Sequence, residues 1–403
     1  MKLCVLGGSS PFTAGLVLAL AARRTRFTGW HLVLHGRHEE RLRTVTQSAA
    51  TWLAPWGWQV TGTTAIESAL EDSGMVLHQI RYGDLALRAR GEELCKEIGV
   101  AADETLGPAA LLTGIESAPG LAALADQLKG RCPGAWILNL TNPLSATTVF
   151  LSQLGVERCI GLCELPAFTA QRIAHRLGVD PERLTWSYSG LNHRGFIHGV
   201  RMGDHNLIPD LLHELKGRTF EGVRSTTIAT LGVVPLKYFR LLEPSSPRPA
   251  SGRAAFLDAL RNRLLREMEA GLEDLPSLRE RYMEWYPGAV VPMLEALETG
   301  SGDPQVANVF EADGLAWERR VRVLGSRIET LPGDPPPAAI VPWLDIFREH
   351  EQRFIEAMKK PSDASVRAVC DADPLIPREH KRSAFDALRA SLGVLEKEPL
   401  WRN

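Results

Sequence analysis

Short apolar runs alternate with helical patterns over the first 190 residues. Each run stops at a glycine or a polar residue. The segment Thr13–Arg24 between two runs carries apolar side chains at helical spacing, behind a threonine able to cap it. Nearly continuous apolar strands separated by helices are typical of a parallel sheet covered on both faces, so the pattern predicts a doubly wound, Rossmann-like α/β domain. The predicted strands are Lys2–Gly7, His31–Gly36, Gly74–Ile80, Ala135–Leu140 and Arg158–Cys163.

The pattern changes after Gly190. Residues His193–Ile208 predict antiparallel strands that turn at Gly203 and Asp204, and long helical patterns follow. We therefore predict two domains, a dinucleotide-binding domain over residues 1–190 and a mostly helical α+β domain over residues 191–403. The clearest helical patterns are Arg253–Leu272 and Asp345–Met358, and Pro247–Gly252 and Pro332–Pro337 are expected to be loops.

Composition narrows the class of protein. The chain has 403 residues, of which 44% are hydrophobic and 23% charged, so it is long enough to bury a large core. Its net charge of -2 gives no general attraction to nucleic acid or to an anionic membrane. The apolar stretch Ala14–Ala22 is shorter than the roughly 20 residues that span a bilayer, and the first residues do not resemble a signal peptide. Six cysteines are too few for a disulfide scaffold, so we expect a cytoplasmic protein that binds neither nucleic acid nor membrane.

The loop after the first strand is the first candidate for chemistry. Gly7 and Gly8 allow a tight turn, and the helix that follows offers free N–H groups to a phosphate. The spacing departs from G-x-G-x-x-G, because Ser9 and Phe12 stand where the second and third glycines would be. The loop is therefore either a dinucleotide site formed by Gly7, Gly8, Ser9 and Ser10 or an ordinary strand-to-helix turn.

The end of the second strand bears on the choice of cofactor. NAD-binding domains usually place an acidic residue there to bind the ribose 2′-hydroxyl, whereas this chain has Gly36 followed by Arg37. Arg37 is either a partner for a 2′-phosphate or a solvated surface charge. We take the first alternative as a hypothesis, in which the site accepts NADP at least as readily as NAD.

Polar residues with no packing role follow two later strands. Asn142 comes after Ala135–Leu140, and Cys163 ends Arg158–Cys163. Ligands of doubly wound sheets bind beyond the carboxyl ends of the strands, so both side chains are expected in one crevice. From these residues alone, Asn142 before a proline also fits an Asx turn, and Cys163 also fits a small buried hydrophobe.

Several longer motifs resemble those of glycoside hydrolase family 4, in the order found there. The resemblance implies a fold like that of lactate and malate dehydrogenases, a bound NAD, a divalent metal that is commonly manganese, and cleavage of glycosides by elimination. The motifs are QIRYGDLALRARGEELCKEIGVAADETLGPAALL (79–112), LNLTNPLSATT (138–148), IGLCELP (160–166), SGLNHRGF (189–196), VVPLKYFR (233–240) and RYMEWYPGAVVPMLEAL (281–297).

The resemblance also implies roles for individual residues. Cys163 and His193 would be the two protein ligands of the metal, and Asn142 would bind sugar hydroxyls. A thiolate and an imidazole suit Mn, Fe, Co, Ni or Zn, and oxygens of the substrate would complete the shell. Without the resemblance, His193 would be read as a loop residue.

Tyr238, in the P-x-x-Y setting of PLKYFR, would be the catalytic base. A phenol has an ordinary pKa of about 10 and needs a nearby cation, either the metal or Arg240, to act at neutral pH. The other interpretation is a structural tyrosine between the domains. Glu164 stands where relatives with different anomeric specificity have aspartate or asparagine, so it is either a general acid or a structural neighbour of the metal.

The anionic end of a substrate is harder to place. The arginine of the family's DER motif is replaced within Gly91-Glu92-Glu93, and an acid at Glu93 would repel a phosphate. Arg240 and Arg281 are the remaining candidates for phosphate binding, and each is otherwise a solvated or interdomain arginine.

Together these features predict a glycosidase for a small, 6-phosphorylated glycoside. The implied cycle is oxidation at C3, removal of the C2 proton with elimination, addition of water and re-reduction. The alternatives are an NAD(P)-dependent sugar or hydroxy-acid dehydrogenase and an inactive nucleotide-binding relative. The resemblance further implies a homo-oligomer, either a dimer or a tetramer.

Overall fold

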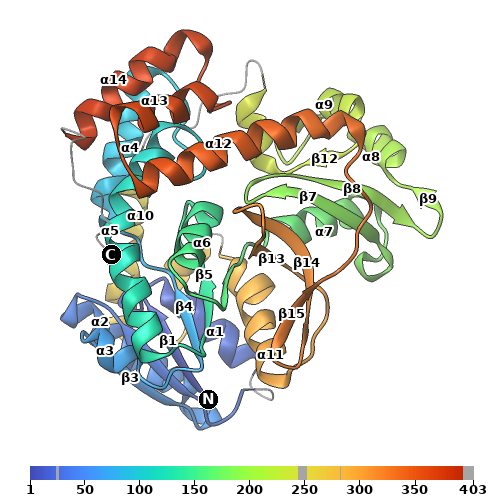
Figure 1. The fold of residues 1–403 in the computed structure, drawn as a ribbon. Helices are drawn as coiled ribbons and strands as arrows, with labels where there is room; N and C mark the ends of the chain where they lie inside the picture. The colour runs from blue at the N-terminus through green and yellow to red at the C-terminus, as the bar shows by residue number, and fades with distance from the viewer. Residues whose placement is uncertain (24–26, 244–251, 282, 394–403) are drawn as a thin grey trace.

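A computed structural model describes residues 1–23, 27–243, 252–281 and 283–393. Six parallel strands form its N-terminal sheet in the order β6-β5-β4-β1-β2-β3, with helices on both faces (Figure 1). All five predicted strands are present, and β3 was not predicted because Val60 is its only large apolar residue. The strands are β1 (Lys2–Leu6), β2 (His31–His35), β3 (Gln59–Thr63), β4 (Met75–His78), β5 (Trp136–Asn139) and β6 (Cys159–Gly161).

Burial in the central strand β1 alternates between two cores. Leu3 and Val5 belong to one hydrophobic cluster, and Cys4 and Leu6 belong to another. A strand with a period of two and buried side chains on both faces is what a doubly wound sheet requires. The helices of this half are α1 (Thr13–Ala22), α2 (Glu39–Leu53), α3 (Ile66–Leu70), α4 (Asp84–Ile98), α5 (Gly107–Arg131), α6 (Leu144–Gln153) and α7 (Leu165–Leu177).

The sheet continues without a break into the second half of the chain. Strand β13 pairs antiparallel with β6, and the order then runs β13-β14-β7-β8-β12. The boundary predicted between residues 190 and 191 falls inside β7, and the division into two domains stays a prediction. The added strands are β7 (Thr185–Leu191), β8 (Arg194–Met202), β9 (His205–Asn206), β12 (Val234–Pro235), β13 (Gln305–Phe310), β14 (Ala316–Leu324) and β15 (Arg327–Thr330), while β10 (Thr219–Phe220) and β11 (Val223–Arg224) form a small separate sheet.

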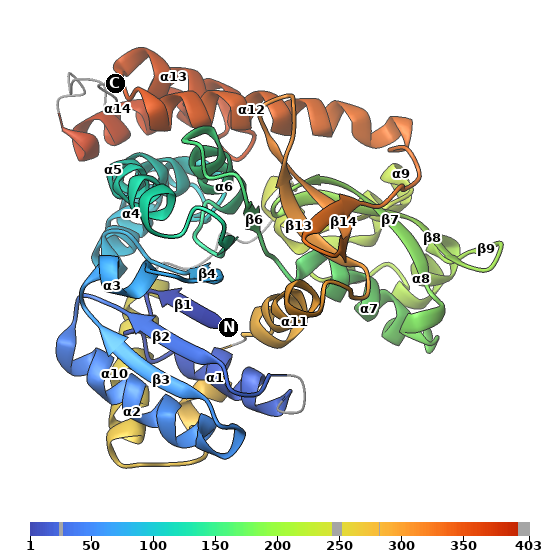
Figure 2. The same cartoon turned by 60° about the horizontal axis from the view of Figure 1, so that its bottom comes forward.

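Helices from the second half also cover the first. The buried side chains of α10 (Arg253–Glu269) and α11 (Val291–Thr299) join the core that contains α1 and α2. Figures 1 and 2 show α12 (Val341–Lys359) running along both halves of the molecule, next to α13 (Asp363–Ala372) and α14 (Lys381–Leu392). Helices α8 (Ile208–Leu215) and α9 (Ser225–Leu231) pack beside β8 and β12.

The predictions for the second half agree with these elements. Strands β8 and β9 turn at Gly203 and Asp204, and both long helical patterns form helices, α10 and α12. Residues 332–337 have no regular structure, as predicted, whereas most of the expected loop Pro247–Gly252 lies outside the described residues. No helix in the described part of the chain is both long and apolar enough to cross a bilayer.

Candidate active site

The turn between β1 and α1 packs closely against two neighbouring strands. Gly7 has a φ of +89°, and a Cβ on it would lie 2.9 Å from the carbonyl oxygen of Gln79. A Cβ on Gly8 would lie 2.9 Å from that of Leu34. The amides of both glycines donate to the carbonyl of His35, at 3.1 and 2.7 Å. Glycine is therefore required at both positions by the close approach of the backbone.

Ser9 fills the space that the missing side chain of Gly36 leaves. A Cβ on Gly36 would lie 2.2 Å from the hydroxyl of Ser9, so a side chain at either position excludes one at the other. Arg37 follows immediately and is exposed, and Ser10 lies at the start of the turn into α1. Together these predicted cofactor residues surround the carboxyl ends of β1 and β2, where binding of a dinucleotide stays a prediction.

The carboxyl ends of β5 and β6 carry the next predicted residues. Asn142 precedes a cis peptide bond to Pro143, and its side-chain amide donates to Glu104 at 2.8 Å. Cys163 is buried, with its sulfur 3.9 Å from a carboxylate oxygen of Glu164. Because β5 and β6 are adjacent and parallel, the two segments leave the sheet side by side.

His193 and Tyr238 meet above this edge. His193 lies in the β7–β8 turn with a φ of +62°, and Tyr238 lies in the 3₁₀ helix Lys237–Leu242. Their rings stack with centroids 4.2 Å apart. Nδ1 of His193 bonds the hydroxyl of Thr105 at 2.8 Å, and burial lowers the pKa of His193 to about 3. The imidazole is therefore neutral at neutral pH, and Nε2 is the nitrogen left for a metal.

The predicted activation of Tyr238 by a nearby cation is not found in the protein alone. Burial raises the pKa of Tyr238 well above 10, and the negative charges of Asp103, Glu104, Cys163 and Glu164 raise it further. The Arg240 guanidinium lies over the ring at 5.9 Å, but burial and these anions dominate.

Glu104 is a charged centre of the site that the sequence did not single out. Although burial opposes ionisation, the nearby cations Arg88, Arg81 and Arg281 hold the pKa of Glu104 at about 2. Arg88 forms an ion pair with it, and Arg81 lies 3.6 Å away. Its place in DETLG, three residues before the glycine that starts α5, was the only available signal.

The structure also revises the expectation for the residues that would bind the phosphate of a substrate. Glu93 is exposed and pairs with Lys96 at 3.0 Å on the surface of α4, so it does not face the site. The guanidinium of Arg281 lies over the ring of Phe12, 4.2 Å from its centroid. Arg281 is thus next to the turn between β1 and α1, and its charge also acts on Glu104. Arg240 lies beside Tyr238 and donates to the carbonyl of Lys237 at 3.0 Å. The two predicted phosphate partners are thus in different parts of the site.

Cys163 and His193 fit a metal that takes its other ligands from elsewhere. In the described ranges, no group of three or more His, Cys, Asp or Glu side chains could hold a metal ion. The adjacent Asn192 donates to Glu318 at 3.0 Å and leaves its own side-chain oxygen buried without a partner. A soft thiol, a neutral imidazole and an unsatisfied amide oxygen are donors that divalent transition metals accept.

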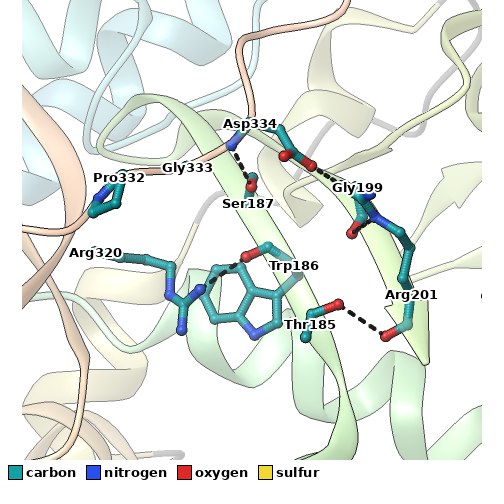
Figure 3. A pocket seen from close by; sticks show the side chains of 9 residues that line it. All are labelled: Thr185, Trp186, Ser187, Gly199, Arg201, Arg320, Pro332, Gly333 and Asp334. Atoms are coloured by element: carbon teal, nitrogen blue, oxygen red, sulfur yellow. Dashed lines mark hydrogen bonds and ion pairs between the residues drawn. The ribbon is translucent and has the colours of Figure 1, made fainter. Parts of the chain in front are cut away.

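A cleft of about 350 Å³ lies at the other end of β7 and contains none of these residues (Figure 3). The charged side chains that line it already have partners. Arg201 forms an ion pair with Asp334, and Arg320 donates to the backbone carbonyl of Trp186 at 3.0 Å. Figure 3 shows these side chains pointing toward one another. The cleft is therefore separate from the site at Cys163.

Comparison with known proteins shows which family the first part of the chain resembles. Residues 2–179 match the family model described as "Family 4 glycosyl hydrolase". This part of the chain is similar to glycosyl hydrolase family 4. Its similarity to a 6-phospho-alpha-glucosidase 1 of Lacticaseibacillus paracasei is 32% identity over 201 residues, which are 49% of this chain and 46% of that relative. The chain therefore aligns with about half the length of this relative.

Two solved structures confirm the predicted fold. A 6-phospho-alpha-glucosidase from gut microorganisms, in complex with NAD and Mn²⁺, superposes on this chain with a TM-score of 0.84 at 19% identity. The superposition covers 98% of both chains. A malate dehydrogenase of Cryptosporidium parvum has a TM-score of 0.54 at 14% identity, covering 89% of this chain and 98% of its own. The dehydrogenase-like α/β architecture predicted from the sequence is thus confirmed.

Proposed function

We propose that the protein is an NAD- and divalent-metal-dependent glycosidase for small 6-phosphorylated glycosides. The observation that carries this proposal is the stacking of His193 on Tyr238 above the edge of the sheet where Cys163 follows β6. Its relatives include 6-phospho-glucosidases, and one similar structure was solved with NAD and Mn²⁺. The similarity to family 4 and the chemistry of these side chains support the same reaction class.

The proposed cofactors have matching protein groups. The turn of Gly7, Gly8, Ser9 and Ser10 would hold the pyrophosphate of NAD, and Cys163 and His193 would hold Mn²⁺. When bound, NAD would accept and return a hydride of the sugar, and the metal would stabilise negative charge that develops on the sugar oxygens.

Tyr238 would accept the C2 proton. Because burial raises the pKa of its phenol, the positive charge of a metal at the adjacent Cys163 and His193 would be needed to favour the phenolate. Burial also raises the pKa of Glu164, so this carboxyl group retains its proton to a higher pH than an exposed glutamate. The position of Glu164 beside Cys163 suits this carboxyl group to donate a proton to the leaving group.

The cationic group formed by Arg81, Arg88 and Arg281 would bind the 6-phosphate. Arginines suit phosphate because they offer paired donors, and Glu104 holds two of these side chains in place. The amide of Asn142, which donates to Glu104, would bind sugar hydroxyls from the same position. A dimer or tetramer in the cytoplasm completes the proposal, and light scattering of the purified protein tests the oligomeric state.

A panel of chromogenic glycosides tests the function. The panel contains both anomers, each with and without a 6-phosphate, and is assayed with Mn²⁺, NAD or NADP, and a thiol reductant. Release of aglycone from a phosphorylated member, without accumulation of reduced nicotinamide, is the expected result. Net reduction of the cofactor would instead identify a dehydrogenase. Cofactor binding with no reaction of any member would identify an inactive relative.

A further inference from the structure

Arg194 follows His193 directly, yet its side chain turns away from the candidate site into the protein interior. It is 3% exposed, and its guanidinium donates to the carbonyl of Asn192 at 3.5 Å and to three groups that are distant in the sequence. These are Nδ1 of His350 at 3.2 Å, the hydroxyl of Ser145 at 3.2 Å and a carboxylate oxygen of Glu351 at 2.5 Å. Both His350 and Glu351 belong to α12, far from His193 in the sequence.

A second branch continues from His350 to the start of α5. Arginine only donates, so Nδ1 of His350 is an acceptor and its proton lies on Nε2. That nitrogen is 3.1 Å from Asp373, whose carboxylate also accepts the amide of Gly107 at 2.6 Å. Gly107 has a φ of +80° and ends the loop that carries Glu104. The connection from Arg194 to Gly107 is thus an unbroken chain of hydrogen bonds.

The third branch reaches the loop of Asn142. Ser145 donates to Glu351 while it accepts from Arg194, so its hydroxyl joins both members of the ion pair. Ser145 lies in the first turn of α6, three residues after Asn142. Three loops of the site, those of His193, Asn142 and Glu104, are therefore attached to one buried group of charges.

We propose that Glu351, His350 and Asp373 are positioning residues for the active site. Acting through Arg194, Ser145 and the Gly107 amide, they fix the three site loops relative to one another. We call these six residues the positioning network. Its side chains are nearly inaccessible to water, at most 3% exposed. This inference rests on the proposed function, because it explains how that site is held.

The energetics favour a role in positioning over one in stability alone. A buried ion pair contributes little net stability, because removing two charges from water offsets their attraction. The same pair has well-defined geometry once its remaining donors and acceptors are satisfied. Side chains that support metal ligands from behind commonly change metal affinity or activity about 10- to 100-fold when they are altered.

The test compares Glu351→Gln and Asp373→Asn with a surface control, Glu349→Gln. Glu349 lies on the same helix and pairs with Arg353 in solvent. For each protein, Mn²⁺ binding is measured by electron paramagnetic resonance in the presence of NAD, NAD binding by fluorescence, and folding by thermal denaturation. Ser145→Ala is a fourth variant that leaves the Arg194–Glu351 pair in place, in case the charge variants fail to fold.

We expect the three network variants to bind Mn²⁺ about 10- to 100-fold more weakly than wild type, while NAD affinity and the control remain unchanged. Activity should fall through kcat. Wild-type Mn²⁺ affinity in every folded network variant would overturn the inference. So would losses of Mn²⁺ and NAD binding in equal proportion, which indicate partial unfolding only. Failure of the proposed function is a separate result, in which wild type binds Mn²⁺ and NAD but cleaves no glycoside.

Discussion

Two regions lie at the same edge of one sheet, but different forces hold them. The first is the turn of residues 7–10, proposed to bind the nucleotide and called here the nucleotide turn. The second is the group around Cys163, His193 and Tyr238, proposed to bind the sugar and called here the sugar site. At the nucleotide turn, backbone hydrogen bonds from Gly7 and Gly8 and close packing of Ser9 on Gly36 fix the shape within the first 40 residues. The sugar site instead joins segments from five distant parts of the chain through buried charges. A site held by packing is local in sequence, whereas a site held by charge pairs is not.

The largest effect is expected at the sugar site. Tyr238→Phe keeps the ring that stacks on His193 and removes the only group proposed to accept the C2 proton. We expect kcat to fall about 10²- to 10⁴-fold, the range for a general base. Steady-state kinetics with a phosphorylated chromogenic glycoside measure it. Unchanged NAD and Mn²⁺ affinities are the control, and a kcat within threefold of wild type would remove Tyr238 from the mechanism.

A substitution that alters only packing at the nucleotide turn should lower the stability of the protein, although it changes no charged group. Gly36→Ala introduces a methyl group into the space of the Ser9 side chain, and we expect a loss of about 1–3 kcal/mol in the free energy of unfolding. Urea denaturation measures this loss. The double variant Gly36→Ala/Ser9→Gly should recover most of it. If the single variant is as stable as wild type, the tight contact at this turn does not exist.

The hypothesis that the site accepts NADP predicts a smaller effect, at the residue that follows Gly36. Arg37 is exposed beyond β2, and a 2′-phosphate there would gain one charged hydrogen bond. We expect Arg37→Ala to weaken NADP binding about tenfold and to leave NAD binding unchanged. Fluorescence titration of both cofactors measures the change. A clear preference of the wild type for NAD would contradict the hypothesis.

The smallest effect concerns the pH dependence of stability. The folded pKa of Glu104 is about 2, below its ordinary 4.5, because of Arg88, Arg81 and Arg281. Its contribution is therefore complete above about pH 4.5 and is lost as the pH falls toward about 2. Glu104→Gln should flatten the stability curve in that window alone. Urea unfolding across a pH series measures the difference, and parallel curves for variant and wild type would contradict it.

The contrast between the two regions also explains what the sequence predicts. Strands such as β1 and β5 are continuous apolar runs, so their period and their glycine or polar ends are visible locally. The residues at the strand ends, Asn142 and Cys163, follow from the rule that ligands bind at that edge. The order of the motifs then gave the resemblance to family 4, from which the dehydrogenase-like fold was predicted.

The ion pairs between residues that are far apart in the chain could not be predicted from the sequence. Nothing near Glu104 shows that Arg88 and Arg281 surround it, and nothing near Arg194 shows that Glu351 lies beside it. Glu93 looked like an obstacle to phosphate binding because its neighbour Lys96 and its outward direction on α4 depend on how the helix packs. Charges carry no periodic signal, so their partners are known only after folding.

Incorporation of solvent deuterium at C2 of the sugar tests the central claim most directly. Wild type is incubated in D₂O with a phosphorylated glycoside, NAD and Mn²⁺, and the released sugar phosphate is examined by mass spectrometry and NMR. The account predicts deuterium at C2 with wild type and none with Tyr238→Phe, which still binds both cofactors. Release of unlabelled sugar by wild type, or labelling that persists without the Tyr238 hydroxyl, would contradict it.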